Sequence, residues 1–511
     1  MQLRAKILEI EAGNKKIVVL NREDAEELGI KSLARIKLSF NQRAITCIVN
    51  VAETIVQKGW IGIYKEVAKI LGVKDNELIE VKVAEYPNSL KYLKRKILGK
   101  RLNYFEIREI VKDVVEGNLT EIEIASFITA LHSFGLSLDE ITSLTLAMVE
   151  TGKKLELKRK VIVDKHSIGG VPGDKTSLIL VPIVAATGLT IPKTSSRAIT
   201  NAAGTADRAE VLMSVDLTIE EMKEVVEKAN GCLVWGGRLD LAPADDIFIQ
   251  IEYPLGIDPL MLPSIMAKKK AVGSKYLVID IPTGRGSKIK TIGDANLLAN
   301  EFIELSKKLF IKTNCAITYG EQPLGYTIGP ALEAKEALEI LMRRKNVIDA
   351  IDKATSLAEV LFEMVGVGNK QTALEILKSG KAEAKLREII SLQGGNEGIK
   401  PEDIEIGNYG LDFYAEKDGV VLWIDNTALI NLARAAGAPK DKEAGILLYK
   451  KIGERVKKGE KIFTVFAKNE RKLDRVLKLE ERPFGIGERV EMLIQVVKEQ
   501  ILHKKTFILE R

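Results

Sequence analysis

Cysteine and long apolar runs are both scarce in this chain of 511 residues. Its three cysteines, Cys47, Cys232 and Cys315, lie far apart without a C-x-x-C pair, which argues against a disulfide framework and against a zinc site. No uninterrupted apolar run approaches the ~20 residues that a membrane-spanning helix needs, and the first residues lack a cleavable signal pattern. These absences predict a cytoplasmic protein with no membrane partner.

An excess of one charge is also missing. The chain has 77 Lys and Arg against 71 Asp and Glu, and the net charge of +6 is small for this length. No basic run is interleaved with aromatic residues, the pattern that many nucleic-acid-binding proteins show. We therefore expect no nucleic-acid partner, and we expect any recognition of anions to be local.

The succession of sequence patterns divides the chain into four units. Residues 1–85 alternate short β-type runs with polar turns and hold no compact set of catalytic side chains, which favours a β-rich accessory or assembly domain. Residues 86–155 have the helix start and stop signals of a helical domain. Residues 156–400 alternate strand-like runs with Gly-rich loops and helices, the rhythm of an α/β sheet, and 401–511 predict a closing α+β unit. No internal repeat is evident.

Capping boxes mark the starts of the helices in the second unit. A hydroxyl or amide side chain followed three residues later by Glu satisfies two free backbone N–H groups at a helix start. The pairs are Asn103 with Glu106, Thr120 with Glu123, and Ser137 with Glu140. The apolar residues behind them recur at helical spacing and predict one shared core.

Glycine and hydrogen-bond donors are concentrated in the stretch VDKHSIGGVPGDKTS, residues 163–177. Its glycines allow a close backbone approach to a ligand, and its hydroxyl and ammonium groups supply donors. A strand-to-helix turn also directs backbone N–H groups and the helix dipole to one point, so this loop suits an oxyanion such as phosphate. The Walker phosphate-loop pattern fails because its second glycine would fall on Asp174. A purely structural turn is the alternative for this loop taken alone.

A second donor-rich loop lies in IPKTSSRAITNAAGTAD, residues 191–207, after another strand-like run. At the carboxyl ends of neighbouring strands, both loops would border one crevice, and two such loops suggest two anions. The stretches GIDPLMLPSIMAKKK (256–270) and PTGRGSKIK (282–290) carry weaker signals. An Asp before Pro is usually a turn or cap residue, and a run of Lys is usually a solvated helix face.

Taken together, DKHSIGGVPGDKTS, SSRAITNAAGTADRAE and the helical prelude ending in LTLAMVETG resemble the thymidine and pyrimidine-nucleoside phosphorylases from about residue 86 to the end. Within that family the chain resembles the archaeal AMP phosphorylase branch, which carries an extra N-terminal domain. The resemblance implies an α/β fold class: a helical domain plus a large α/β domain of the nucleoside phosphorylase type, an extra N-terminal β-rich domain and a C-terminal α+β unit. It also implies that about residues 245–275 return to the helical domain.

The same resemblance implies a reaction and its participants. Inorganic phosphate would displace the base from a ribosyl group, and AMP would give adenine and ribose 1,5-bisphosphate; CMP and UMP are further candidates. AMP and inorganic phosphate are thus the expected small-molecule partners. Neither a metal nor an organic cofactor is expected, because phosphate is itself the nucleophile. The family also implies a homo-oligomer, a dimer or larger.

Site residues follow from the resemblance by matching motifs position by position. Asp258 corresponds to the proton donor. Positions that contact the nucleotide correspond to Gly170, Ser196, Arg197, Ala198, Ile199, Thr200, Asn201, Thr205, Ser264 and Lys288. Additional phosphate or base contacts correspond to Lys165, His166, Ser167, Ser177, Ser195 and Lys268.

The chain departs from the pattern of the pyrimidine enzymes in three places. Pro172 is inserted between GGV and GD, and Ile251 stands where those enzymes have an arginine seven residues before the aligned Asp258. The segment from Asp258 to Ser264 is also two residues shorter. The first two departures argue against pyrimidine recognition of the usual kind, and the third bears on the alignment of Ser264.

Phosphorolysis places negative charge on the departing base, and a carboxylic acid that keeps its proton near neutral pH can neutralise that charge. We hypothesise that Asp258 is this acid. Three alternatives stay open at this point. One is a nucleoside phosphorylase, the second is a magnesium-dependent phosphoribosyltransferase of the same fold, and the third is a scaffold that binds nucleotides without turning them over.

Overall fold

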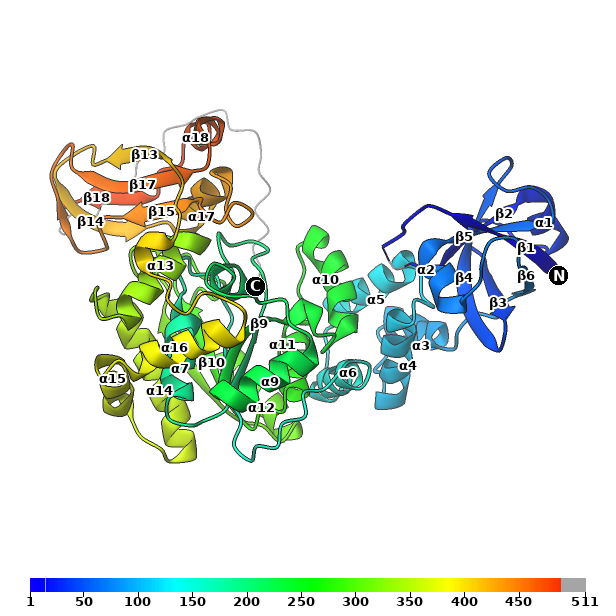
Figure 1. The fold of residues 1–511 in the computed structure, drawn as a ribbon, viewed down its shortest axis with the longest axis horizontal. Helices are drawn as coiled ribbons and strands as arrows, with labels where there is room; N and C mark the ends of the chain where they lie inside the picture. Colours follow the sequence, from blue (N-terminus) through cyan, green and yellow to red (C-terminus); the bar gives the residue numbers. More distant parts are fainter. Residues whose placement is uncertain (14, 489–511) are drawn as a thin grey trace.

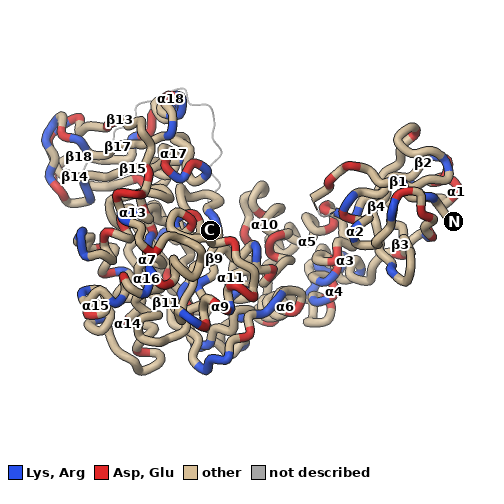
Figure 2. Tube along the Cα trace, in the orientation of Figure 1, with Lys and Arg blue, Asp and Glu red and all other residues tan. Residues whose placement is uncertain are grey.

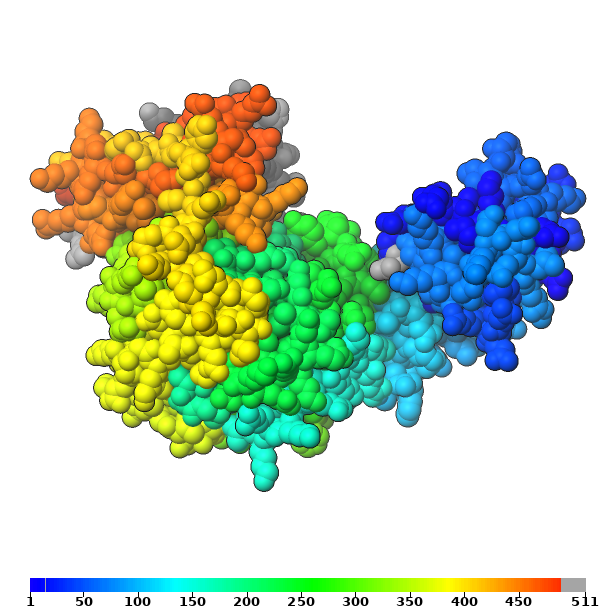
Figure 3. Space-filling model, in the orientation of Figure 1, coloured from blue at the N-terminus to red at the C-terminus, as the bar shows by residue number. Residues whose placement is uncertain are grey.

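A computed structural model of the protein describes residues 1–13 and 15–488. An N-terminal barrel lies at one end of the elongated molecule, and a helical domain connects it to an α/β domain that carries a C-terminal β unit (Figure 1; Figure 3). Basic and acidic residues are interspersed over all of these parts (Figure 2). None of the helices in the described ranges is long and apolar enough to cross a bilayer. The fold class predicted from the sequence is confirmed.

Six strands of the N-terminal unit close into a barrel in the order β1-β5-β2-β4-β3-β6. Alternate apolar side chains, including Leu3, Ala5 and Ile36, fill its interior, as expected for strands with one buried face. The elements are β1 Gln2–Leu8, β2 Ile17–Asn21, α1 Arg22–Glu27, β3 Arg35–Phe40, β4 Arg43–Ala52, β5 Trp60–Tyr64, α2 Lys65–Leu71 and β6 Leu78–Val83.

The barrel contains an internal repeat, so the expectation that the chain has none was wrong. The order β-β-α-β occurs twice, and the parallel pairs β1–β5 and β2–β4 are equivalent in the two halves. Left-handed backbone also recurs at equivalent points, with φ of 71° at Leu33 and 69° at Asn76, and 68° at Gly29 and 70° at Gly72. The two halves share the order of their elements and the geometry of their turns rather than identical residues. The repeat is therefore difficult to recognise in the sequence alone.

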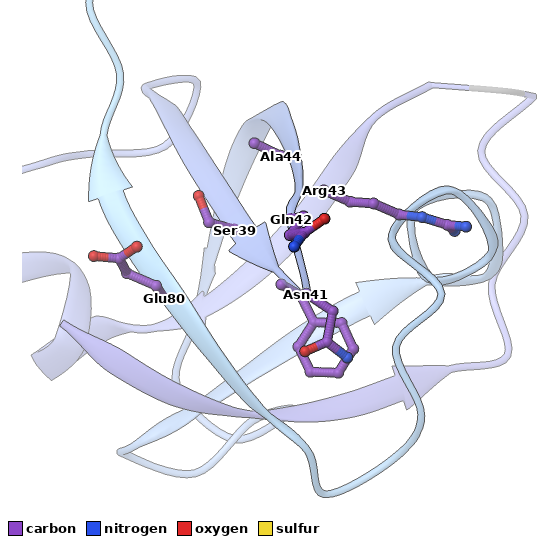
Figure 4. A pocket seen from close by; sticks show the side chains of 7 residues that line it. Ser39, Asn41, Gln42, Arg43, Ala44 and Glu80 are labelled. Carbon is purple, nitrogen blue, oxygen red and sulfur yellow. The ribbon is translucent and has the colours of Figure 1, made fainter.

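A shallow pocket lies on this barrel beside the hairpin that joins β3 to β4 (Figure 4). Asn41 and Gln42 both adopt positive φ in that turn, which two-residue hairpin turns require. The lining residues are Ser39, Phe40, Asn41, Gln42, Arg43, Ala44 and Glu80. They provide no pairing of nucleophile and base, and the barrel projects away from the donor-rich loops (Figure 1).

The helical domain combines four consecutive helices with two that return from later in the chain. Its core includes Ile110 of α4, Phe127 of α5, Leu144 of α6 and Phe248 of α10. All three capping boxes predicted from the sequence are present. The helices are α3 Ser89–Ile97, α4 Tyr104–Val115, α5 Glu121–Phe134, α6 Leu138–Glu150, α10 Pro243–Leu255 and α11 Met261–Ala271.

The α/β domain is built on parallel strands, with β11-β10-β7 in one ladder and β8-β9 in another. A parallel bridge between Ile162 and Thr190 joins the two ladders, and Val163 N–H donates to Thr190 O over 2.9 Å. Strands β7 and β8 are therefore neighbours, and the two donor-rich loops follow their adjacent carboxyl ends. The strands are β7 Val163–Ser167, β8 Ile191–Ser195, β9 Gly231–Trp235, β10 Tyr276–Thr283 and β11 Lys312–Tyr319.

Helices cover this sheet, and every residue of α7 is buried, as its unbroken apolar sequence requires. The helices are α7 Thr176–Ala185, α8 Thr205–Ala209, α9 Ile219–Ala229, α12 Ile292–Lys308, α13 Pro330–Leu341, α14 Ile348–Val365, α15 Lys370–Lys378 and α16 Lys381–Leu392, with short 3₁₀ turns η1 at Gly236–Arg238 and η2 at Pro401–Asp403.

The C-terminal unit packs two small antiparallel sheets with α17 and α18. Strand β12 of the α/β domain pairs with β15 and so continues one of these sheets across the boundary between the units. The last part of the predicted unit, 489–511, lies outside the described residues. The elements are β12 Thr327–Ile328, β13 Tyr409–Tyr414, β14 Gly419–Ile424, α17 Asn426–Ala435, β15 Gly445–Leu448, β16 Arg455–Val456, β17 Lys461–Ala467, α18 Glu470–Leu477 and β18 Phe484–Gly487.

Candidate active site

The loop between β7 and α7, which we call the first loop (residues 168–175), lies directly against the turn that carries Lys288. Gly170 has φ of 95°, and a Cβ atom there would lie 2.5 Å from the backbone nitrogen of Lys288. Only glycine fits such a position without moving the neighbouring backbone. Two sequence-predicted site residues, Gly170 and Lys288, are thus brought together although they are far apart in the chain.

Lys165 and Ser167 project from β7 beside two carboxylates, the buried Asp280 and the partly buried Asp174. Lys165 Nζ lies 3.7 Å from Asp280 Oδ2 and 4.0 Å from Asp174 Oδ2, so neither contact is a short hydrogen bond. Ser167 Oγ donates to Asp280 Oδ2 over 2.9 Å. Burial alone would raise the pKa of Asp174, but the nearby positive charges of Lys353 and Lys165 hold the pKa well below its usual range. Positively and negatively charged side chains therefore alternate beneath the candidate site.

The second loop, residues 196–204, is shaped by one carboxylate. Asp207 accepts hydrogen bonds from the backbone N–H groups of Ala198 over 2.7 Å and Gly204 over 2.8 Å. Asn201 Nδ2 donates to Val171 O over 3.2 Å, which ties the second loop to the first. Both loops are consequently parts of one structure, as the sequence suggested.

The C-terminal unit holds the second loop from outside. Arg434 of α17 donates from one guanidinium nitrogen to Ile199 O over 3.0 Å and to Asn201 O over 3.1 Å. A peptide group whose carbonyl faces Arg434 directs the N–H of the next residue the opposite way. Within the described ranges, the backbone N–H groups of Arg197, Ile199 and Thr200 have no acceptor. Free N–H groups in a loop that precedes a helix favour an anion.

The guanidinium of Arg197 is already engaged with protein groups. It makes two hydrogen bonds to Glu210, of 2.8 and 2.7 Å, and lies 4.9 Å from the centre of the Trp235 ring. The hydrogen bonds to Glu210 raise the pKa of Arg197 above its ordinary value. Its side chain thus shapes the loop, and its backbone N–H is the group left for a ligand.

Asp258 reaches the site from the helical domain, in the turn between α10 and α11. Its side chain is accessible to water, yet desolvation by the surrounding protein raises the pKa of its carboxyl; the positive charge of Lys288 lowers it and Asp245 raises it. Lys288 is exposed and has no hydrogen bond or ion pair with the residues described here. Side chains from two domains, Asp258 and Lys288, are therefore close enough to interact electrostatically, and the ammonium of Lys288 is left for a ligand's negative groups.

Glu252 fixes the turn that carries Asp258. Its Oε1 accepts from Leu260 N–H over 3.2 Å, while Ile257 N–H donates to its backbone carbonyl over 3.2 Å. Burial and the neighbouring Asp258 raise the pKa of Glu252 to about 8. An acid that holds its proton near neutral pH thus supports the turn of the candidate proton donor.

The residues predicted to contact the base lie on α11 and β7. Ser264 and Lys268 lie one helical turn apart on α11, and Lys268 Nζ bonds Asp245 Oδ2 over 2.5 Å. Burial and nearby lysines, Lys269 first among them, lower the pKa of His166 well below its usual value. His166 is therefore neutral at pH 7, so one ring nitrogen can donate and the other can accept.

The remaining candidates are held by local hydrogen bonds or by burial. Ser195 Oγ donates to Val234 O over 3.1 Å at the end of β8. Thr205 begins α8, and its Oγ1 accepts from Arg208 over 3.4 Å, while Ser177 is buried in the first turn of α7. Among residues 1–13 and 15–488, no group of three or more His, Cys, Asp or Glu side chains is arranged to hold a metal ion.

Comparison with known proteins places these loops in a family. The helical bundle domain of a glycosyl transferase family matches residues 90–152, the a/b domain of that family matches 159–384, and the pyrimidine nucleoside phosphorylase C-terminal domain matches 420–486. The AMP phosphorylase of Thermofilum pendens is 48% identical over 100% of both chains. The chain belongs to the AMP phosphorylase family. The AMP phosphorylase of Pyrococcus furiosus is 50% identical and covers 98% of this chain and 100% of its own, and that of Methanocaldococcus jannaschii is 47% identical over 97% and 99%.

The central fold of this AMP phosphorylase family member is shared more widely. The anthranilate phosphoribosyltransferase of Thermus thermophilus aligns with a TM-score of 0.51 at 19% identity, over 59% of this chain and 99% of its own. At that identity the likeness concerns the fold alone, because one fold supports different chemistries through its site residues.

Several residues that shape the site escaped the sequence analysis. Asp280 lies in the apolar strand β10, Lys353 in the middle of α14, and Arg434 in the C-terminal unit. None of them stands in a motif with the two loops. Only a charged residue inside an otherwise buried strand, as at Asp280, offered a signal, since unpaired charges are rarely buried.

Proposed function

We propose that the protein cleaves AMP by phosphorolysis, in which inorganic phosphate attacks the anomeric carbon of the ribose and adenine departs. The second product is ribose 1,5-bisphosphate; CMP and UMP are further candidate substrates. The observation that carries the proposal is the bond between Asn201 and Val171, which joins two anion-binding loops at adjacent strand ends. Full-length membership of the AMP phosphorylase family supports the same reaction.

The two loops suit the two phosphate groups of this reaction. Lys165, Ser167 and Ser177 would hold inorganic phosphate beside the sugar. The free N–H groups of the second loop, with Lys288, would hold the 5′ phosphate of the nucleotide. Binding both anions tightly in the ground state would not accelerate the reaction, so these donors must fit the attacking geometry best.

Asp258 is proposed as the general acid. Negative charge grows on the base as the glycosidic bond breaks, and transfer of the carboxyl proton to a ring nitrogen neutralises it. The raised pKa of Asp258 favours the protonated form that this step needs. His166, neutral at pH 7, lies on the same strand as Lys165 and can hydrogen-bond the base without adding charge. Ser264 and Lys268 are further candidates for base contacts.

The decisive experiment measures phosphate-dependent release of free base from a panel of nucleoside monophosphates and nucleosides, without added metal. Release from AMP with little release from adenosine is the expected result, because the 5′ phosphate has a binding role. Release from nucleosides alone would contradict it and indicate a nucleoside phosphorylase. Activity that appears only with magnesium, and that yields or consumes pyrophosphate, would indicate a phosphoribosyltransferase instead.

A further inference from the structure

A buried ion pair lies beneath the first loop, outside every motif in the sequence. Lys353 Nζ on α14 is 2.9 Å from Asp280 Oδ2 on β10, and both side chains are buried. Thr318 Oγ1 donates to the other carboxylate oxygen, Asp280 Oδ1, over 2.6 Å. Asp280 thus has two partners, Lys353 and Thr318, that are not among the predicted phosphate contacts.

The same carboxylate also has two partners that are among the predicted phosphate contacts. Ser167 Oγ donates to Asp280 Oδ2, and Lys165 Nζ approaches that oxygen to 3.7 Å. A phosphate ion bound by Lys165 and Ser167 must draw both donors toward itself. Asp280 would then lose two partners and stand as a buried carboxylate close to a second anion, an arrangement that costs binding energy.

Counting the charges shows what Lys353 does in that exchange. Lys165 and Lys353 face Asp174 and Asp280, so these four charges balance. The charge of Arg208 also acts on Asp174, but Arg208 is itself paired with Glu333 over 2.8 Å. Without Lys353, one net negative charge would remain in a buried place next to an incoming phosphate. With Lys353, the carboxylate of Asp280 stays neutralised after Lys165 turns to the ligand.

We propose that Lys353 is a positioning residue for the inorganic phosphate site: it neutralises Asp280, and so releases Lys165 and Ser167 to bind the anion. The identity of the anion as inorganic phosphate rests on the proposed function. Lys353 itself touches no substrate in this arrangement and acts through Asp280.

Steady-state kinetics of charge variants test the proposal. Lys353→Met is expected to raise KM for phosphate about tenfold or more and to leave KM for AMP little changed. The reason is that removing one partner of a buried ion pair leaves the negative charge of Asp280 uncompensated. The double variant Lys353→Met/Asp280→Asn removes both charges and should recover most of the lost phosphate affinity. Lys353→Arg, which keeps the charge, should lie close to the wild type.

Phosphate binding measured by isothermal titration calorimetry without nucleotide provides a readout independent of catalysis, and thermal unfolding checks each variant. An equal rise in KM for AMP and phosphate, or no recovery in the double variant, would overturn the proposal and leave Lys353 a purely structural residue. If Lys353→Met does not fold, the phosphate affinity of Asp280→Asn is compared with that of the double variant. Equal affinities support the proposal, because Lys353 has no charge left to neutralise once Asp280 is an amide. A further loss of affinity in the double variant contradicts the proposal. Wild-type phosphate binding without AMP cleavage would refute the proposed reaction, yet the binding comparison would still decide the role of Lys353.

Discussion

The two donor-rich loops are held in place by different means. The first loop rests on charged groups, with Lys165 between Asp174 and Asp280, and its Gly170 packs against the backbone of Lys288. The second loop rests on backbone geometry: Asp207 accepts from its N–H groups, and Arg434 draws its carbonyls outward. We therefore expect ligand binding at the first loop to depend on the balance of charges beneath it. Ligand binding at the second loop should depend on Asp207 and Arg434, which orient its peptide groups.

The largest effect is expected from Asp258→Asn, which concerns neither loop. The amide keeps the size of the side chain and removes its proton, so kcat should fall by ~10²–10⁴-fold while KM for both substrates changes little. Single-turnover release of adenine measures the chemical step. Unchanged turnover in a folded variant would remove Asp258 from the mechanism and assign catalysis to the loops themselves.

Gly170→Ala tests the tight approach of the first loop. The new Cβ would meet Lys288 N at 2.5 Å in a backbone region that alanine rarely adopts, so kcat/KM for phosphate should fall about 100-fold through misplacement of the donors.

Gly169→Ala is the matched control, because Gly169 has φ of 84° but open space around its Cβ position. It should cost only the backbone strain and lose far less activity. Equal losses in the two variants would show that strain alone, rather than the contact with Lys288, explains the effect.

Arg434→Met tests the outside support of the second loop. Loss of the bonds to Ile199 O and Asn201 O should let the peptide groups reorient, which raises KM for AMP about tenfold with KM for phosphate nearly constant. Initial rates at varied AMP and phosphate separate the two constants. Lys442→Met is the control: it also removes a C-terminal cation near the loop, but one that pairs with the Glu210 carboxylate at 2.9 Å rather than with the carbonyls of the loop. A parallel rise in both constants for Arg434→Met would contradict separate roles for the loops.

The smallest effect concerns Glu252, which lies in neither loop and holds the turn that carries Asp258. Its pKa is raised from 4.5 to about 8 on folding, so its contribution to stability is complete below pH 4.5 and is lost as the pH rises through 8. The Glu252→Gln variant has no carboxyl group at this position to ionise, so it does not lose this stability as the pH rises. The unfolding temperature of the variant relative to wild type should therefore rise by about 3 °C between pH 5 and pH 9. A flat difference for Glu252→Gln would refute the buried acid.

Parts of this architecture could be predicted from the sequence because the signals are local. The three capping boxes formed as expected, since Asn103, Thr120 and Ser137 need only a Glu three residues ahead. The barrel's repeat was missed because two halves with similar shape require only similar apolar patterns. Arg197 shows the limit for the site: its sequence neighbours indicate an anion-binding loop, but not that Glu210 occupies its guanidinium.

By itself the sequence determined the two glycine-rich loops, the strands that precede them and the family to which they belong, because these depend on the order of residues along short segments. Only the tertiary structure decided that Val171 and Asn201 would meet, that Lys353 would neutralise Asp280, and that Arg434 would hold a loop more than 200 residues away in the chain. Burial and long-range pairing arise when distant segments pack together, and the energy of a buried charge depends on those neighbours rather than on its place in the sequence.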